Sequence, residues 1–193
     1  PAYIQGPLPE EIAKFLMVYI LIKKLDCKYV LNGLLIGCAV GVGFAAQESA
    51  GYAINQFTLY GDMAMHKVNL MRGITAVGGH SVWAAMYGAA LVHEKKKESL
   101  KIAHVATSSV LVAFFSAFGL HFVWNFPLGV LLGSDNLEWV KYVALTIVAW
   151  CVIFKWMRKG LVQVIEIGNR MMQGKVSINC VQGVLRGNSF DIT

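Results

Sequence analysis

The sequence predicts an all-helical membrane protein, a bundle of about five transmembrane helices. Hydrophobic residues make up 56% of the 193 residues and charged residues only 15%, whereas soluble domains carry about 25% charged residues. The apolar residues gather in runs close to the roughly 20 residues that cross a bilayer core. Basic residues cluster in every second connection between these runs, as expected for a multi-pass chain embedded in lipid.

Five hydrophobic stretches define the expected helices. They are residues 11–22, 29–54, 70–92, 102–125 and 137–157. The first is short for a full crossing, and Pro127 favours a break soon after the fourth. The chain begins at Pro1 rather than at a methionine, which is compatible with further transmembrane helices upstream.

The charges of the connections orient the chain. Basic residues follow the first, third and fifth stretches: Lys23, Lys24, Lys28, Lys95, Lys96, Lys97, Lys101, Lys155, Arg158 and Lys159. The connections at 55–69 and 133–136 carry no such excess. The positive-inside rule therefore places the first residues outside and the C-terminal tail in the cytoplasm. The net charge of +6 is accounted for in this way, and no basic patch interleaved with aromatic residues indicates nucleic-acid binding.

The segment after Arg158 turns polar, and residues 176–192 alternate apolar and polar side chains around Gly183 and Gly187. This pattern predicts short β-strands. We therefore divide the chain into a transmembrane domain, residues 1–160, and a cytosolic tail, residues 161–193.

Glycines recur every four residues in the second stretch, at Gly33, Gly37 and Gly41, with Gly43 just beyond. Such spacing lets the backbone of another helix approach closely. We interpret these glycines as a packing surface without chemistry of its own.

Glu48, His80 and His121 lie within three different hydrophobic stretches. Each ionisable side chain near the bilayer centre costs about 2.5–3.5 kcal/mol on insertion scales, so these three should face one another or a wet cavity. Counted from the predicted helix ends, all three fall in the outer half of the membrane, as do Glu10 and Glu11. We expect the five side chains to converge.

Two neutral imidazoles and a carboxylate form a common zinc ligand set that leaves a position for water. We therefore predict zinc, or another divalent metal, held by Glu48, His80 and His121. Such a metal polarises a carbonyl and activates water, and both effects serve peptide hydrolysis. Glu11 is the expected general base, supported by Glu10, so that Glu11→Gln should remove activity and leave the protein folded.

Four short motifs, each in its own predicted helix, follow one another between residues 7 and 127. They are Glu10-Glu11-x-x-Lys14, Phe44-x-x-x-Glu48, an isolated His80, and His121-x-x-x-Asn125. Together they resemble the motifs of PrsW intramembrane proteases, which are related to CAAX prenyl proteases and bacterial abortive-infection proteins. A CAAX enzyme usually has His in place of Glu48 and Arg at or near Lys14, and this difference favours the PrsW branch.

The resemblance implies a multi-pass enzyme of a bacterial cell membrane. Its partners would be the lipid bilayer and a single-pass membrane protein, such as an anti-sigma factor, cut near the outer face of the membrane. Asn125 would help His121 to stabilise an oxyanion. The tail, through Gly183, Gly187 and the apolar residues between and after them, resembles the opening strands of forkhead-associated domains, which implies binding of a phosphothreonine peptide.

Several other interpretations are consistent with the same residues. Glu10 and Lys14 could form a simple surface ion pair, and either His80 or His121 alone could be a hydrogen-bonded packing residue. A glutamate could activate water without any metal. The buried acids and histidines could instead relay protons in a transporter, although no inverted repeat supports this, or the chain could be an inactive membrane anchor of a signalling module.

Overall fold

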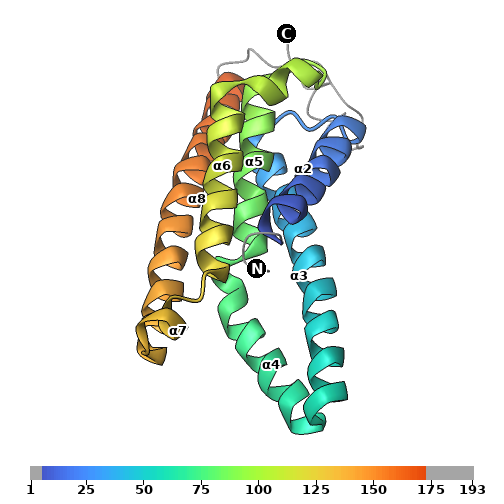
Figure 1. Cartoon of the computed structure of the whole chain (residues 1–193). Coiled ribbons are helices and arrows are strands. Elements are labelled where there is room, and N and C mark those ends of the chain that lie inside the picture. The colour runs from blue at the N-terminus through green and yellow to red at the C-terminus, as the bar shows by residue number, and fades with distance from the viewer. Residues whose placement is uncertain (1–5, 173–193) are drawn as a thin grey trace.

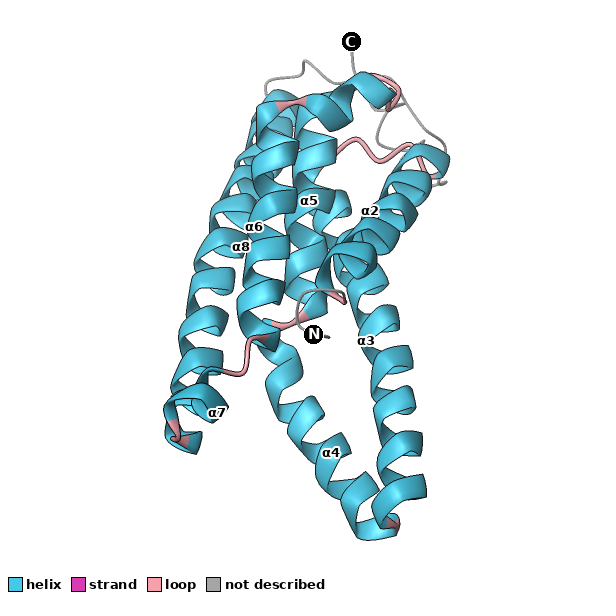
Figure 2. Ribbon diagram, in the orientation of Figure 1, coloured by secondary structure: helices cyan, strands magenta, loops and turns pink. Residues whose placement is uncertain are grey.

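The computed structural model describes residues 6–172, and every regular element in that part of the chain is helical (Figures 1 and 2). The elements are α2 (Pro7–Lys24), α3 (Val30–Tyr60), α4 (Asp62–Thr75), η1 (Ala76–Gly78), α5 (His80–Lys95), η2 (Ile102–Ala106), α6 (Ser108–Asn125), α7 (Leu128–Leu132) and α8 (Asp135–Met172). The all-helical prediction is confirmed for this part of the chain. The predicted strands at 176–192 lie outside the described residues.

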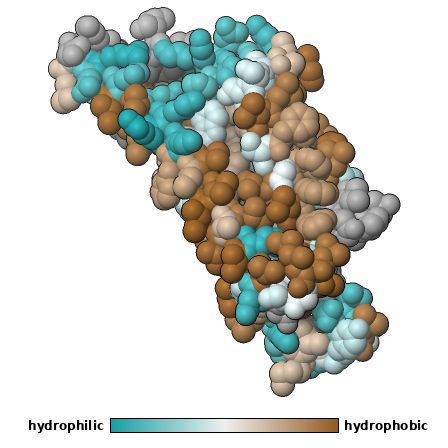
Figure 3. Space-filling view, turned by 60° about the vertical axis from the view of Figure 1, so that its left-hand side comes forward, coloured by the Kyte–Doolittle hydropathy of each residue, from teal (hydrophilic) through white to brown (hydrophobic). Residues whose placement is uncertain are grey.

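Three of these helices, α3, α6 and α8, are long and apolar enough to cross a membrane. The short helix α5 lies at the centre of the bundle and contacts α2, α3, α6 and α8. Every residue of α5 from 82 to 92 is buried. On the face drawn in Figure 3 the surface is apolar over its middle, and hydrophilic residues lie at both ends, most densely at one of them. The protein is therefore a membrane-embedded helical bundle, and the number of five crossings stays a prediction.

The stretch predicted to be a loop, residues 55–69, is helical instead. Helix α3 continues to Tyr60, Gly61 turns the chain at a φ of 83°, and α4 follows at once. Helix α4 has no buried residues and projects with the end of α3 beyond the rest of the bundle (Figure 1). Hydropathy missed this helical hairpin because polar residues form helices outside a hydrophobic core as readily as apolar ones do.

The last helix also continues past its predicted end at residue 157. Helix α8 has 38 residues, a length of about 57 Å at 1.5 Å per residue, whereas the hydrocarbon core is only about 30 Å thick. Its C-terminal end lies beside the connections that follow α2 and α5 (Figure 1). The three basic segments thus gather at one end of the bundle, opposite the α3–α4 turn and α7.

Helix α3 packs directly on α5 through its glycines, which confirms the predicted packing surface. A Cβ atom added to Gly33 would meet the carbonyl of Gly88, and one on Gly37 would meet the backbone of Ala84. A Cβ atom on Gly41 would meet the carbonyl group of His80. The close approach therefore fixes the first residue of α5 against α3.

We expect Gly37→Ala to lower the thermal stability of the detergent-solubilised protein, because the new methyl group must push α5 away. Overpacking of this kind costs about 1–3 kcal/mol. Gly43→Ala is the matched control, since nothing lies within 4 Å of the position of its Cβ and alanine favours a helix over glycine. Equal unfolding temperatures for the two variants would contradict this packing.

Candidate metal centre and active site

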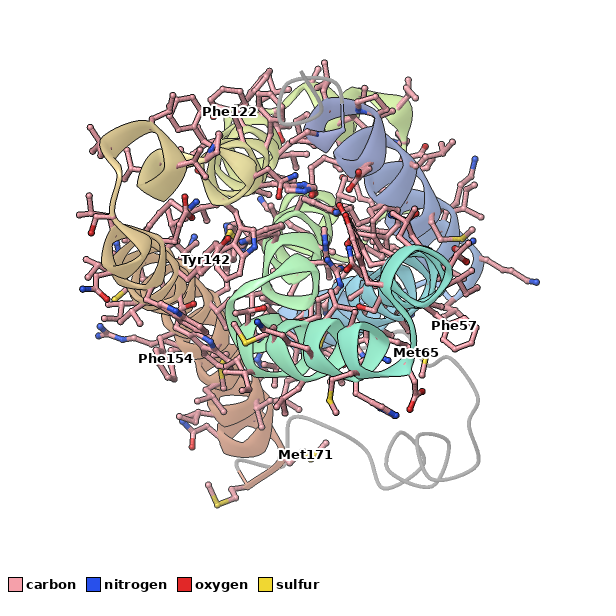
Figure 4. All side chains as sticks on the ribbon, turned by 60° about the horizontal axis from the view of Figure 1, so that its bottom comes forward. Phe57, Met65, Phe122, Tyr142, Phe154 and Met171 are labelled. Carbon is pink, nitrogen blue, oxygen red and sulfur yellow. The ribbon has the colours of Figure 1, made fainter. Side chains whose placement is uncertain are left out.

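The candidate side chains come from four helices and meet at the end of the bundle away from the basic segments. Glu10 and Glu11 stand near the start of α2, His80 is the first residue of α5, and His121 lies near the end of α6. Glu48 reaches them from α3. Figure 4 looks into the bundle from this end. The structure brings all five predicted side chains together.

Glu11 lies at the closed back of this cluster and is fully buried. Its carboxylate accepts hydrogen bonds from Lys14 Nζ at 2.5 Å, from His121 Nδ1 at 2.8 Å and from the Tyr87 hydroxyl at 3.3 Å. The side chain of Lys14 is only 1% exposed, so the interpretation of Lys14 as half of a surface ion pair is wrong. Glu11 holds His121 and Lys14 in place and has no contact with solvent.

His80 bridges the two halves of the cluster. Lys14 Nζ lies 2.7 Å from His80 Nδ1, and His80 Nε2 lies 2.9 Å from Glu48 Oε2. An ammonium group only donates and a carboxylate only accepts, so Nδ1 is the acceptor and Nε2 carries the proton in this arrangement. The rings of His80 and His121 meet edge to face, with their centres 4.9 Å apart. The ring of Trp83 stacks on that of His121, with 4.7 Å between the ring centres. Both imidazoles are therefore held in defined orientations.

Glu10, His80 and His121 form the group that can hold a metal. Their ligand atoms lie within 4.8 Å of one another. Glu10 Oε2 is buried without a hydrogen-bond partner and lies 3.6 Å from His121 Nε2. Because His121 Nδ1 donates to Glu11, the lone pair of Nε2 faces Glu10, which is the arrangement of metal-binding histidines whose other nitrogen bonds a carboxylate. The residues present fit a divalent cation that would replace two of the hydrogen bonds seen here, one of the two at His80 and the one from Asn125 Nδ2 to His121 Nε2.

The charge balance of the cluster agrees with a bound cation. Among residues 6–172, three carboxylates, those of Glu10, Glu11 and Glu48, face two cationic side chains, those of Lys14 and Arg72. With both histidines neutral, the cluster carries one excess negative charge. Because an unpaired charge is costly away from water, a metal ion would stabilise this group.

Glu48 occupies a different place from the one expected from the sequence. Its Oε2 binds Arg72 at 2.5 Å as well as His80, and Glu10 stands in its place among the three clustered ligands. The Arg72 guanidinium also donates to Ser49 Oγ at 2.8 Å and lies 4.5 Å from the centre of the Tyr52 ring. Sequence reasoning missed Arg72, although a lone arginine in a hydrophobic stretch is the same signal that identified Glu48.

We expect Arg72→Met to lower cleavage activity by roughly 10–100-fold, the usual effect of removing an outer-shell partner. Glu48 would lose its cation and no longer be held against His80. Arg72→Lys should not restore activity fully, because a single ammonium cannot make the forked contacts to Glu48 and Ser49. Lys67→Met, at an exposed position of the same helix, is the control. Equal activity of Arg72→Met and Lys67→Met would contradict a positioning role.

The cluster opens into a cleft of about 880 Å³. Glu10, Glu48, Arg72 and Asn125 line this cleft, together with residues of α7 and α8. Asn125 Nδ2 lies 3.2 Å from His121 Nε2. The acidic and amide side chains of the cluster therefore line a cleft that lies between α4 on one side and α6, α7 and α8 on the other.

Comparison with known proteins agrees with this geometry. The sequence model of one protein family, the PrsW family intramembrane metalloproteases, matches residues 1–157. No curated protein and no solved structure matches the chain. The match covers all the clustered side chains and most of the chain. The protein belongs to the PrsW family of intramembrane metalloproteases and is a membrane-embedded protease.

Proposed function

We propose that the enzyme cuts a single-pass membrane protein, of the anti-sigma-factor type, at a peptide bond that enters the cleft beside Glu10 and Asn125. We further propose that Glu10, His80 and His121 hold a divalent metal, zinc by the nature of the ligands. The observation that supports this most is the unpartnered buried oxygen of Glu10 beside His121 Nε2, at the inner end of the cleft.

A bound metal would polarise the scissile carbonyl and make water more acidic. The protein side chains would orient the metal ligands, accept the proton of the attacking water and stabilise the oxyanion. Glu11 keeps His121 in the tautomer that presents Nε2 to the cleft. Within the described residues, Arg72 and His80 both contact Oε2 of Glu48, which leaves Oε1 to accept a proton from water in the cleft. Asn125 Nδ2 is placed to donate a hydrogen bond to the developing oxyanion.

Co-reconstitution with single-pass substrates tests this function. Wild-type protein in liposomes should convert a substrate band into two fragments, and a metal chelator should stop the conversion. The same liposomes, loaded with a pH-sensitive dye, report whether the protein carries protons. Dissipation of a proton gradient without cleavage of any membrane-anchored substrate would contradict the proposal and indicate transport.

We propose that the cleft faces the outside of a bacterial cell and that the end of α8 faces the cytoplasm. The basic connections after α2 and α5 lie at the end of the bundle opposite α4 and α7 (Figure 1), and residues of α4 and α7 line the cleft. The predicted phosphopeptide-binding tail would then be cytoplasmic. Asp62→Cys and Lys96→Cys should be labelled by impermeant maleimides from opposite sides. The native Cys27 should interfere little, because burial raises the pKa of its thiol. Labelling of both introduced cysteines from one side would contradict this orientation.

A further inference from the structure

A second cavity lies at the basic end of the bundle, far from the cluster of acids and histidines. Its volume is about 570 Å³, and it forms where the α2–α3 connection, the end of α5 and the last turns of α8 meet. The polar residues of its wall include Lys28, His93, Lys96, Lys97, Gln163 and Arg170. Three segments far apart in the sequence therefore contribute to one basic pocket.

The pocket has an excess of positive charge. Four cations line it, from Lys28, Lys96, Lys97 and Arg170, against two acids, Glu98 and Glu166. The carboxylate of Glu98 lies 3.3 Å from Lys101, which is outside the lining, and that of Glu166 lies 3.9 Å from Arg170, so that the lining keeps two more cations than acids. The positive-inside rule requires basic residues at this end of the protein, but it does not require them to surround a single cavity.

If the Lys159–Trp156 pair of α8 marks the membrane boundary, the pocket stands at the level of lipid headgroups. Lys159 Nζ lies 4.3 Å from the centre of the Trp156 ring, a pairing typical of the membrane interface. Gln163 follows Lys159 by four residues, a rise of about 6 Å. The headgroup layer is roughly 5–8 Å deep on each side of the hydrocarbon core. The inner rim of the pocket thus falls within that layer.

The walls of the pocket are partly apolar, and its backbone is unusual at one point. Tyr29 and Ile167 line it beside the cations, so an amphiphile could place its glycerol region against them. Lys96 adopts a φ of 52° and a ψ of −123°, a positive-φ conformation that costs energy in a residue other than glycine. This strain turns the chain at the end of α5, next to the pocket.

We propose that this pocket binds the headgroup of an anionic phospholipid. Lysine and arginine side chains bind phosphate oxygens through charge-assisted hydrogen bonds, and basic pockets between helices at the membrane surface are suited to such headgroups. A zwitterionic lipid would bring no net charge to offset the excess cations. The site is independent of the proteolytic cluster and of the proposed substrate.

Native mass spectrometry of the full chain, titrated in detergent with phosphatidylglycerol or phosphatidylcholine, tests this proposal. The wild type should retain phosphatidylglycerol in preference to phosphatidylcholine. The double substitution Lys96→Gln/Arg170→Gln should weaken phosphatidylglycerol binding by roughly 25-fold, which corresponds to about 1 kcal/mol for each charge. Lys23→Gln/Lys24→Gln removes the same charge from exposed positions at the same end, outside the pocket lining, and should bind like the wild type.

Arg170→Gln alone, at a side chain that is 48% exposed, provides a variant that should fold normally if the double variant does not. It should weaken binding by roughly fivefold. Equal binding of the two lipids, equal effects of the pocket and control substitutions, or displacement of phosphatidylglycerol by millimolar inorganic phosphate would overturn the proposal.

Discussion

His121→Ala is expected to lower cleavage of a membrane-anchored substrate on the order of 10³-fold or more, beyond the 10–100-fold typical of an outer-shell residue. The substitution removes a proposed metal ligand, the imidazole whose Nε2 lies 3.6 Å from Glu10 Oε2. Activity is measured by the disappearance of the substrate band in co-reconstituted liposomes.

His66→Ala is the matched control, because His66 lies on α4 with its side chain 67% exposed. Its activity should equal that of the wild type. Because His121 is buried, the unfolding temperature of each variant must be compared as well. A folded His121→Ala protein that cleaves at the wild-type rate would exclude His121 from the reaction.

Glu11→Gln is expected to destabilise the protein by about 3 kcal/mol, in addition to impairing cleavage. The sequence alone suggested a general base whose amide substitute would leave the fold intact. In the structure Glu11 is fully buried and pairs with the buried ammonium of Lys14. Removal of one partner of such a pair leaves an uncompensated charge inside the protein, which costs about 3–5 kcal/mol.

The double variant Glu11→Gln/Lys14→Met tests the physical reason. It removes both charges, so thermal or denaturant unfolding should show that most of the lost stability returns. Cleavage should stay low, because His121 still lacks the carboxylate that orients it. If Glu11→Gln unfolds at the same temperature as the wild type, the buried pair does not have the role that we assign to it.

The convergence of the acids and histidines could be predicted from the sequence for an energetic reason. Glu48, His80 and His121 could not each face lipid without a large cost, and their positions along the predicted helices allowed one common depth. The glycine spacing on α3 likewise predicted the contact with α5, because close approach depends on residue size alone.

The individual contacts could not be predicted, because they depend on directions of side chains that spacing does not define. Glu10 and Glu11 are neighbours in the sequence. Glu10 lines the cleft, whereas Glu11 is buried and accepts a hydrogen bond from the Tyr87 hydroxyl. Arg72 reaches Glu48 only because α4 folds back as a helix where a loop was expected. Hydropathy reports burial in lipid and carries little information about a helix outside it.

The most direct test of the central claim is the metal content of the purified protein, measured beside its cleavage activity. We predict about one divalent ion per chain in the wild type, as a three-residue ligand set would hold. Glu48→Gln should retain the ion and lose activity, whereas Glu10→Gln should lose both. Full cleavage by metal-free wild-type protein would contradict the account and would indicate that a glutamate activates water directly.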